Sequence, residues 1–227
     1  MTDVFMETSV STGMHRSSMH RLEIPIFNGE NQRVGKLIAF SDETVADAAL
    51  VEMLTSWRNR HRQFFLTQFE ATVPRTRQWL EHTILADSTR VMFFIHEHSG
   101  EPIGHIGVLR LDQPTVELDN MIRGRSGGNG QLMHWAEVAL LRWLFEVRRV
   151  SGVCLQVLAN NWIPIRLHSM IGFRVVEALP LVRQELNDEI HLVVSPDVGN
   201  VLETKLWRME LSHYDFTNSL ACLDTPS

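Results

Sequence analysis

Apolar and polar residues follow one another along the chain in a pattern that predicts both strands and helices. Two apolar runs, Arg21–Asn28 and Arg33–Phe40, flank a short connection that contains Gly29, and this arrangement is typical of a β-hairpin. Later runs are rich in branched and aromatic residues. They predict strands at Val91–His96, Pro102–Leu109, Thr115–Ile122, Val153–Leu158, Phe173–Val176, Ile190–Val194 and Lys205–Leu211.

Helical periodicity lies between these strands. A helix is predicted to start at Ser41, because Ser and Asp side chains accept hydrogen bonds from the free N–H groups of a first turn, and its apolar positions run from Val45 to Trp57. Three more helices are predicted over Thr72–Leu85, Gln131–Arg149 and Asn161–Met170, the last ended by Gly172. The order of elements predicts a mixed α/β fold around one sheet.

Composition narrows the class of protein. The chain has 227 residues, and its 21 Lys+Arg against 27 Asp+Glu leave a net charge of −6, which argues against nucleic acid as a partner. Cys154 and Cys222 form neither a disulfide framework nor a zinc pattern, so we expect no metal and a reducing cytoplasm. No apolar stretch is long enough for a membrane span or a signal peptide, so no membrane partner is expected.

The chain divides into three parts. Residues 1–20 are polar and rich in Ser and Thr, and we expect a flexible segment. Residues 21–216 are expected to form a single domain with an N-terminal hairpin and a C-terminal β extension, and residues 217–227 a tail.

Glycines cluster at Gly124–Gly130, between a predicted strand and a predicted helix. Unpaired N–H groups at a helix start and glycines that allow close approach favour an anion site, although a loop that is only flexible is the alternative. The P-loop pattern is absent because no Lys follows these glycines, and the dinucleotide pattern fails after Gly130. The pattern that fits is R-x-x-G-x-G at Arg125, Gly128 and Gly130.

Residues Asn161–Phe173 (NWIPIRLHSMIGF) resemble the N-x-x-A-I-x-L-Y-x-x-x-G-F signature of the GNAT superfamily of N-acetyltransferases, with departures at Pro164 and His168. The segment follows the glycine turn by one helix and one strand, as in that family, and the resemblance covers roughly Lys36 to Val194. It implies a mostly antiparallel sheet with two splayed parallel strands and flanking helices. It also implies acetyl-CoA or another acyl-CoA as co-substrate, bound between those strands.

By similarity, the splayed strands are Val116–Ile122 and Val153–Leu158. For Asn161, a helix N-cap is an equally good physical interpretation. The CoA-binding residues that the resemblance implies are Met121, Ile122, Arg125, Ser126, Gly127, Gly128, Asn129, Gly130, Asn161 and Arg166.

Aminolysis of a thioester requires orientation, a base or water relay, an oxyanion donor and an acid. The acid of this family is usually a Tyr, and His168 occupies that place, which makes it the expected proton donor; a packed residue lining the CoA channel is the alternative. For the base, Glu117 and Asp119 fall on one face of their strand, and Asn120 and His105 are further candidates.

Arginines gather where the first helix ends and the second begins. Arg forks pair with phosphates, so this group suits an anionic acceptor, although the dipole at a helix C-terminus explains part of it. The expected acceptor-binding residues are Trp57, Arg58, Asn59, Arg60, Arg75 and Arg77. The surrounding elements resemble the GNAT subgroup that N-acylates nucleotide-linked amino sugars, and also the ribosomal-protein N-terminal acetyltransferases.

The leading hypothesis is therefore an acyl-CoA-dependent N-acyltransferase that acts on a nucleotide-linked amino sugar, a small-molecule acceptor. Two alternatives stay open: an N-acetyltransferase of a protein N-terminus or small amine, and an acyl-CoA-binding module without catalysis. A homodimer is also left open.

Overall fold

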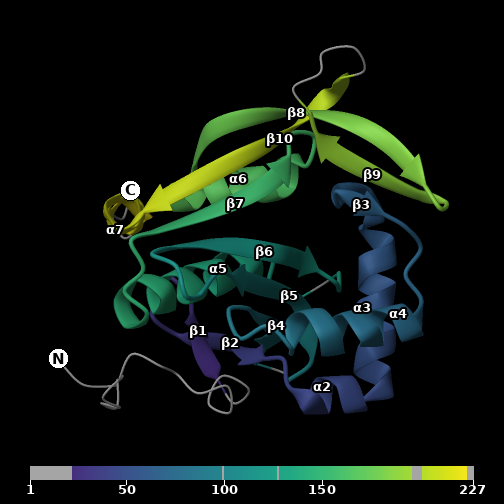
Figure 1. Cartoon of the computed structure of the whole chain (residues 1–227). Coiled ribbons are helices and arrows are strands. Elements are labelled where there is room, and N and C mark those ends of the chain that lie inside the picture. The colour runs from purple at the N-terminus through teal and green to yellow at the C-terminus, as the bar shows by residue number, and fades with distance from the viewer. Residues whose placement is uncertain (1–21, 99, 127, 196–200, 224–227) are drawn as a thin grey trace.

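The computed structural model of the protein describes residues 22–98, 100–126, 128–195 and 201–223. In these residues a 10-stranded sheet runs in the order β1-β2-β4-β5-β6-β7-β10-β8-β9-β3, and helices cover both of its faces (Figure 1). One pair, β6 with β7, is parallel, and the other adjacent pairs are antiparallel. The predicted fold class is confirmed. The predicted flexible segment at residues 1–20 lies outside the described residues.

The first half of the sheet matches the predicted hairpin and meander. The hairpin turn is closed by Asn28, whose side-chain oxygen accepts from the backbone N–H of Gln32 at 2.8 Å. Alternation along these strands places apolar residues on both faces of the sheet, where two separate cores form. The strands are β1 (Glu23–Phe27), β2 (Arg33–Ala39), β4 (Val91–Glu97), β5 (Pro102–Leu109) and β6 (Thr115–Arg123).

The helix predicted from Ser41 is two helices, α2 (Asp42–Ala46) and α3 (Ala48–Arg60). The prediction of one helix was wrong because Asp47 leaves the helical conformation and caps α3, accepting from the N–H groups of the next turn. The second predicted helix is confirmed as α4 (Val73–Trp79), which continues as the π-helical turn η2 (Leu80–Ile84).

Helices α2, α3 and α4 pack on one face of the sheet, where the smaller of the two cores holds them in place. It contains Val51, Leu54, Trp57 and Leu80 from the helices, packed on side chains of β4 and β6. Between α3 and α4 lie the short turn η1 (Arg62–Phe64) and the two-residue strand β3 (Thr67–Gln68).

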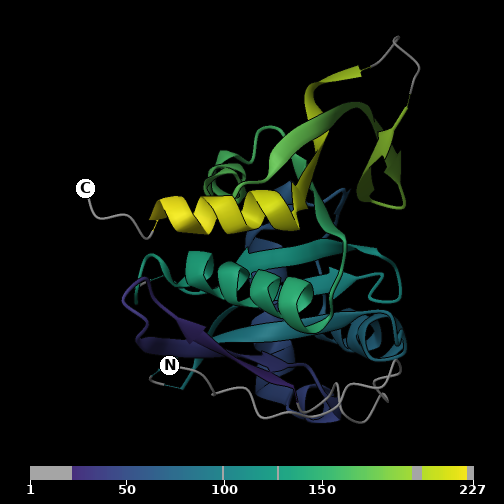
Figure 2. The ribbon, with the colours of Figure 1, turned by 90° about the vertical axis from the view of Figure 1, so that its left-hand side faces the viewer.

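The opposite face carries the larger core and three helices (Figure 2). They are α5 (Leu132–Arg142), extended by the π-helical turn η3 (Trp143–Val147), α6 (Trp162–Ile171) and α7 (His213–Leu223). Gly172 ends α6 as predicted, with a φ of +111° that favours glycine. Strand β7 (Gly152–Leu158) connects α5 to α6.

The C-terminal strands are longer than predicted: β8 (Arg174–Leu186), β9 (Glu189–Val194) and β10 (Val201–Ser212). Most of β8 is exposed, and its pairing with β10 and β9 defines its length. Strand β9 also pairs with β3, which brings the C-terminal extension beside the α3–α4 connection. The predicted boundary between residues 216 and 217 falls inside α7.

Candidate active site

The parallel strands β6 and β7 pair only over their first halves. The pairing ends at Leu118 and Leu155, although both strands continue beyond these residues. The divergence begins where Asn120 takes a φ of +51°, next to an irregular register between β5 and β6. This bulge moves the side chains to the other face: Leu118 packs in the larger core, whereas Ile122 packs in the smaller one. The predicted splayed pair is therefore present.

Residues of α3 and the turn after it contact the end of β6 and fix the position at which the glycine loop begins. Trp57 is 3% exposed and lies against Gly124, where an added Cβ would come within 1.9 Å of the indole ring. Arg60 Nη1 donates to the Gly124 carbonyl at 2.6 Å, and His61 Nε2 lies 3.1 Å from the Arg123 carbonyl. Trp57 and Arg60, predicted to contact the acceptor, thus hold the loop.

The glycine loop already binds an anionic oxygen of this chain. The backbone N–H of Asn129 donates to a carboxylate oxygen of Glu97 at 3.0 Å. The same carboxylate lies 2.8 Å from the position of a Cβ on Gly128, whose φ is +65°. At Gly130 an added Cβ would have no atom within 4 Å. One backbone N–H of the loop thus bonds a carboxylate just before the start of α5.

The other predicted loop residues are exposed, including Ser126. The Arg125 guanidinium pairs with the Glu101 carboxylate, beside the same loop. Gly127 lies outside the described residues. Met121 is half-buried against the larger core, and the Ile122 side chain is buried in the smaller one.

The start of α6 lies at the C-terminal end of β7, at the same edge of the sheet as the glycine loop. Asn161 stands at the N-cap position, but its side chain makes no capping hydrogen bond there. The Asn161 side chain thus does not cap α6 in this structure, which was the alternative interpretation of this residue. Pro164 is accommodated because it falls in the first turn of α6, where its missing N–H has no helical partner to lose. Arg166 is exposed on the same helix.

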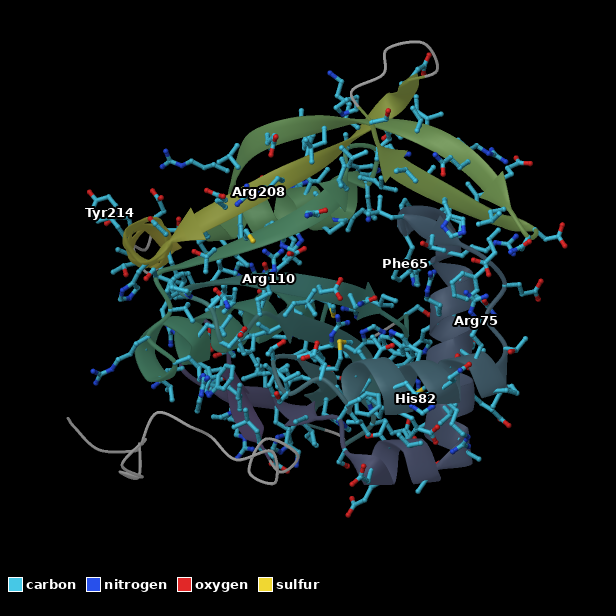
Figure 3. All side chains as sticks on the ribbon, viewed as in Figure 1. Phe65, Arg75, His82, Arg110, Arg208 and Tyr214 are labelled. Atoms are coloured by element: carbon cyan, nitrogen blue, oxygen red, sulfur yellow. The ribbon has the colours of Figure 1, made fainter. Side chains whose placement is uncertain are left out.

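His168 lies between α6 and α5 rather than on an open surface. Its side chain is 6% exposed, and Nδ1 lies 2.7 Å from Oε1 of Glu137, whose side chain is 0% exposed. The ring also packs edge-on against Phe173. Tyr214, the only tyrosine of the chain, is 75% exposed on α7 and lies at the far end of the molecule from Arg75 (Figure 3).

The candidate bases gather around the bulge. Asp119 bonds with the Asn120 side chain, and burial raises the pKa of Asp119 while Arg90 opposes that change. Burial lowers the pKa of His105 to about 4, against a raising contribution from its hydrogen bond with the Asn120 backbone. Glu117 is 9% exposed and paired with Arg110, which commits it to a structural ion pair. Asp119 and His105 thus lie beside Asn120, whereas Glu117 is bound in its ion pair with Arg110.

The arginines at the ends of α3 and α4 have partners within the chain. Arg58 donates to the Thr67 carbonyl at 2.7 Å, and its guanidinium lies 3.5 Å from the centre of the Phe65 ring. Burial, followed by the positive charge of Arg75, lowers the pKa of Arg58 to about 10. Arg77 donates to the Val45 carbonyl, away from the other three arginines.

Arg75 and Arg58 come together on a shared aromatic ring. The Arg75 guanidinium lies 3.4 Å from the centre of Phe69 and that of Arg58 lies 4.9 Å from it. Arg75 also pairs with Glu189 of β9 at 2.5 Å. Asn59 bonds both backbone groups of Ala71 and fixes the chain before α4. Of the predicted acceptor residues, only Arg58 and Arg75 form a common cationic cluster.

Sequence reasoning missed two carboxylates of the site. Glu97 ends a strand and gives no local signal, because its contact with Asn129 spans 32 positions. Glu137 did carry a signal: it stands among Met133, Ala136 and Leu140 on the buried side of α5, where an unpaired carboxylate is costly. A charged residue at that position indicates a buried partner.

Within the described ranges, no group of three or more metal-ligating side chains lies close enough together to hold a metal ion. In the same ranges, no helix has the length and apolar character that crossing a membrane requires.

Residues 37–174 match the model of the acetyltransferase (GNAT) domain family. A search of curated proteins found no match. Among solved structures, RimL, a ribosomal L7/L12 alpha-N-protein acetyltransferase in complex with coenzyme A, superimposes with a TM-score of 0.63 at 13% identity, covering 84% of this chain and 98% of that one.

Two other structures share the fold. Spermidine N-acetyltransferase from Vibrio cholerae, in complex with CoA and spermine, has a TM-score of 0.59 at 12% identity over 80% of this chain and 97% of its own. An uncharacterized protein from Bacillus halodurans has a TM-score of 0.60 at 14% identity over 91% and 97% of the two chains.

Proposed function

The chain belongs to the acetyltransferase (GNAT) domain family, and from this premise we propose that it transfers an acyl group from an acyl-CoA to an amine. The observation that carries the proposal is the glycine loop beside the diverging strands β6 and β7, where the N–H of Asn129 binds a carboxylate oxygen. A phosphate oxygen accepts hydrogen bonds from the same kind of donor. The solved complexes of RimL and of spermidine N-acetyltransferase, which share the fold, contain CoA.

The residues that would hold the diphosphate are those of the loop from Arg125 to Gly130. The positive end of the α5 dipole favours an anion there, and the N–H of Asn129 already donates to the Glu97 carboxylate. Asn161 has a side chain that is not used in capping, so it can bond the amide-bearing arm of CoA. The backbone beyond the Asn120 bulge can bond the same arm, because β7 has turned away from it.

An occupant of the loop must displace the Glu97 carboxylate, and this gives a prediction. Glu97→Gln should strengthen acetyl-CoA binding roughly two- to fivefold, because it removes a negative charge that competes for the same N–H groups. Isothermal calorimetry measures the change. Glu23→Gln, which removes a carboxylate paired with Lys36 on the hairpin, is the matched control and should leave the affinity unchanged. Weaker binding by the Glu97 variant would contradict the prediction.

The chemistry assigned to the chain is the aminolysis of a thioester with general acid–base catalysis. Asp119 stands beside the bulge, and because burial raises its pKa, it is the stronger candidate to accept the proton of an attacking amine, directly or through water. His105 is the weaker base, because burial lowers its pKa to about 4. His168, at the position of the family's Tyr, is proposed to supply the proton to the leaving sulfur. Its burial excludes water and strengthens that interaction.

For the acceptor, two candidates each have one supporting observation. The Arg58–Arg75 cluster on Phe69 supports the nucleotide-linked amino sugar, since two neighbouring guanidiniums suit a diphosphate. The shared fold of a protein N-terminal acetyltransferase and a polyamine acetyltransferase supports a protein N-terminus or small amine. All four predicted arginines have partners within the chain, and this weakens the first candidate.

A single substitution tests the cationic cluster. Arg75→Ala should raise the KM for a nucleotide-linked amino sugar roughly fivefold and leave the KM for acetyl-CoA unchanged, because it removes a contact made equally in ground and transition states. Arg208→Ala is the matched control: its side chain is 41% exposed against 44% for Arg75, and it too pairs with a carboxylate. An unchanged acceptor KM in Arg75→Ala removes the physical support for that acceptor class.

The proposed function itself is tested with acetyl-CoA and a panel of three acceptors: a nucleotide-linked amino sugar, a peptide with a free N-terminus, and spermidine. Release of free CoA that depends on one of them supports the transferase. Acetyl-CoA binding without turnover of any amine would instead identify an acyl-CoA-binding module, and absence of binding would contradict the proposal.

A further inference from the structure

Glu137 and His168 form a buried pair between α5 and α6. A carboxylate with 0% exposure is costly unless it is hydrogen-bonded, and His168 supplies that bond at 2.7 Å. The second oxygen of Glu137 is buried without a hydrogen-bond partner. An apolar side chain would fill this position at lower cost, so the carboxylate is a feature that packing alone does not require.

The pair joins the two helices that follow the parallel strands. Helix α5 starts at the glycine loop after β6, and α6 starts directly after β7. Glu137 is thus positioned by the helix that follows β6, and His168 by the helix that follows β7. Glu137 also acts on His134, one turn earlier on α5: burial lowers the pKa of His134, and the charge of Glu137 opposes that change.

The contact with Glu137 involves Nδ1 of His168 and does not involve Nε2. An ionised carboxylate only accepts hydrogen bonds, so an ionised Glu137 requires the proton of the pair on Nδ1. Among the described residues, no hydrogen bond joins Nε2 of His168 to another group. Nε2 is the atom that remains for a reacting partner.

We propose that Glu137 is a positioning residue, which holds His168 in the Nδ1–H form with Nε2 directed to the reaction. The proposal rests on the proposed function and deepens it. In the step concerned, the amine nitrogen forms a bond to the thioester carbon and the carbon–sulfur bond breaks. The proton that the amine loses passes through water to Nε2 of the neutral imidazole, and the resulting imidazolium gives this Nε2 proton to the departing thiolate. The imidazole is left neutral with Nδ1–H bonded to Glu137.

This assignment predicts the tautomer of His168 independently of any activity. In protein labelled with ¹⁵N-histidine, long-range ¹H–¹⁵N correlation spectra report which ring nitrogen carries the proton, and His168→Gln identifies the resonance. We expect the Nδ1–H form in the parent. In Glu137→Gln, whose amide both donates and accepts, we expect a mixture of the two tautomers. A parent protein with the proton on Nε2 overturns the proposal, whether or not an acceptor has been found.

Kinetics test whether Glu137 acts through His168. Glu137→Gln should lower kcat about tenfold with little change in the KM for acetyl-CoA, because the amide no longer selects one tautomer. Added to His168→Ala, the same substitution should lower kcat no further, since its effect passes through the missing ring. Glu146→Gln, an exposed glutamate in the continuation of α5, is the control for the loss of a charge.

The outcomes separate the two proposals. Equal losses from Glu137→Gln in the presence and absence of His168 indicate a structural cross-link and overturn the positioning role. A protein that binds acetyl-CoA but acylates none of the amines, with the Nδ1–H form observed, contradicts the proposed function alone.

Discussion

His168→Ala is expected to lower kcat about a hundredfold, the scale of one general acid, while the affinity for acetyl-CoA changes far less. The phosphates are assigned to the loop at the start of α5, on a different element from His168, so binding and chemistry should separate. Steady-state kinetics with the accepted amine, together with calorimetry for acetyl-CoA, measure both quantities.

The alanine variant also leaves Glu137 without a partner in the core, and that alone can destabilise the protein. His168→Gln is therefore the matched variant, because its amide can still bond Glu137 but supplies no acidic proton. Both variants should be slow, and circular dichroism should show the glutamine variant folded. A folded His168→Gln protein that turns over like the parent would assign the proton to water or substrate.

Gly130→Val is expected to weaken acetyl-CoA binding tenfold or more, about 1.4 kcal/mol, with the fold intact. An added Cβ meets nothing within 4 Å in this structure, so the substitution does not disturb the protein itself. The valine side chain would instead project from the loop that is assigned to the diphosphate. Calorimetry with acetyl-CoA measures the loss.

Gly29→Val is the control for this substitution. Gly29 lies in the turn of the first hairpin and also has no atom within 4 Å of an added Cβ, so the valine should change neither fold nor affinity. Gly128→Val is the less informative variant, because a φ of +65° makes any side chain strained there. Unchanged affinity in a folded Gly130→Val protein would remove the loop from the CoA site.

Much of the fold was readable from local pattern. The hairpin, the meander and the ends of α4 and α6 follow from alternation and from capping residues such as Thr72 and Gly172. The break at Asp47 was missed, because Asp tolerates both a helix interior and a cap. The length of β8 was missed because Glu177 and Pro180 interrupt its apolar residues, and its pairing with β10 and β9 defines it.

The candidate site was predictable in its motifs and less so in its contacts. The loop from Arg125 to Gly130 and the signature from Asn161 were recognisable because each is short and continuous. Trp57 and Arg60 were placed near the acceptor because their types and positions fit that role. Packing of the indole on Gly124 and the bond to its carbonyl connect residues more than 60 positions apart, which no local pattern reports.

The sequence by itself determined most of the strands and helices, the glycine loop between β6 and α5, and the family, because these depend on residues that are neighbours along the chain. The tertiary structure alone decided what each charged side chain meets. Glu97 meets the loop, Arg75 meets Glu189, and His168 meets Glu137. The physical reason is that burial and pairing set the cost of a charge, and both arise only when distant segments pack together.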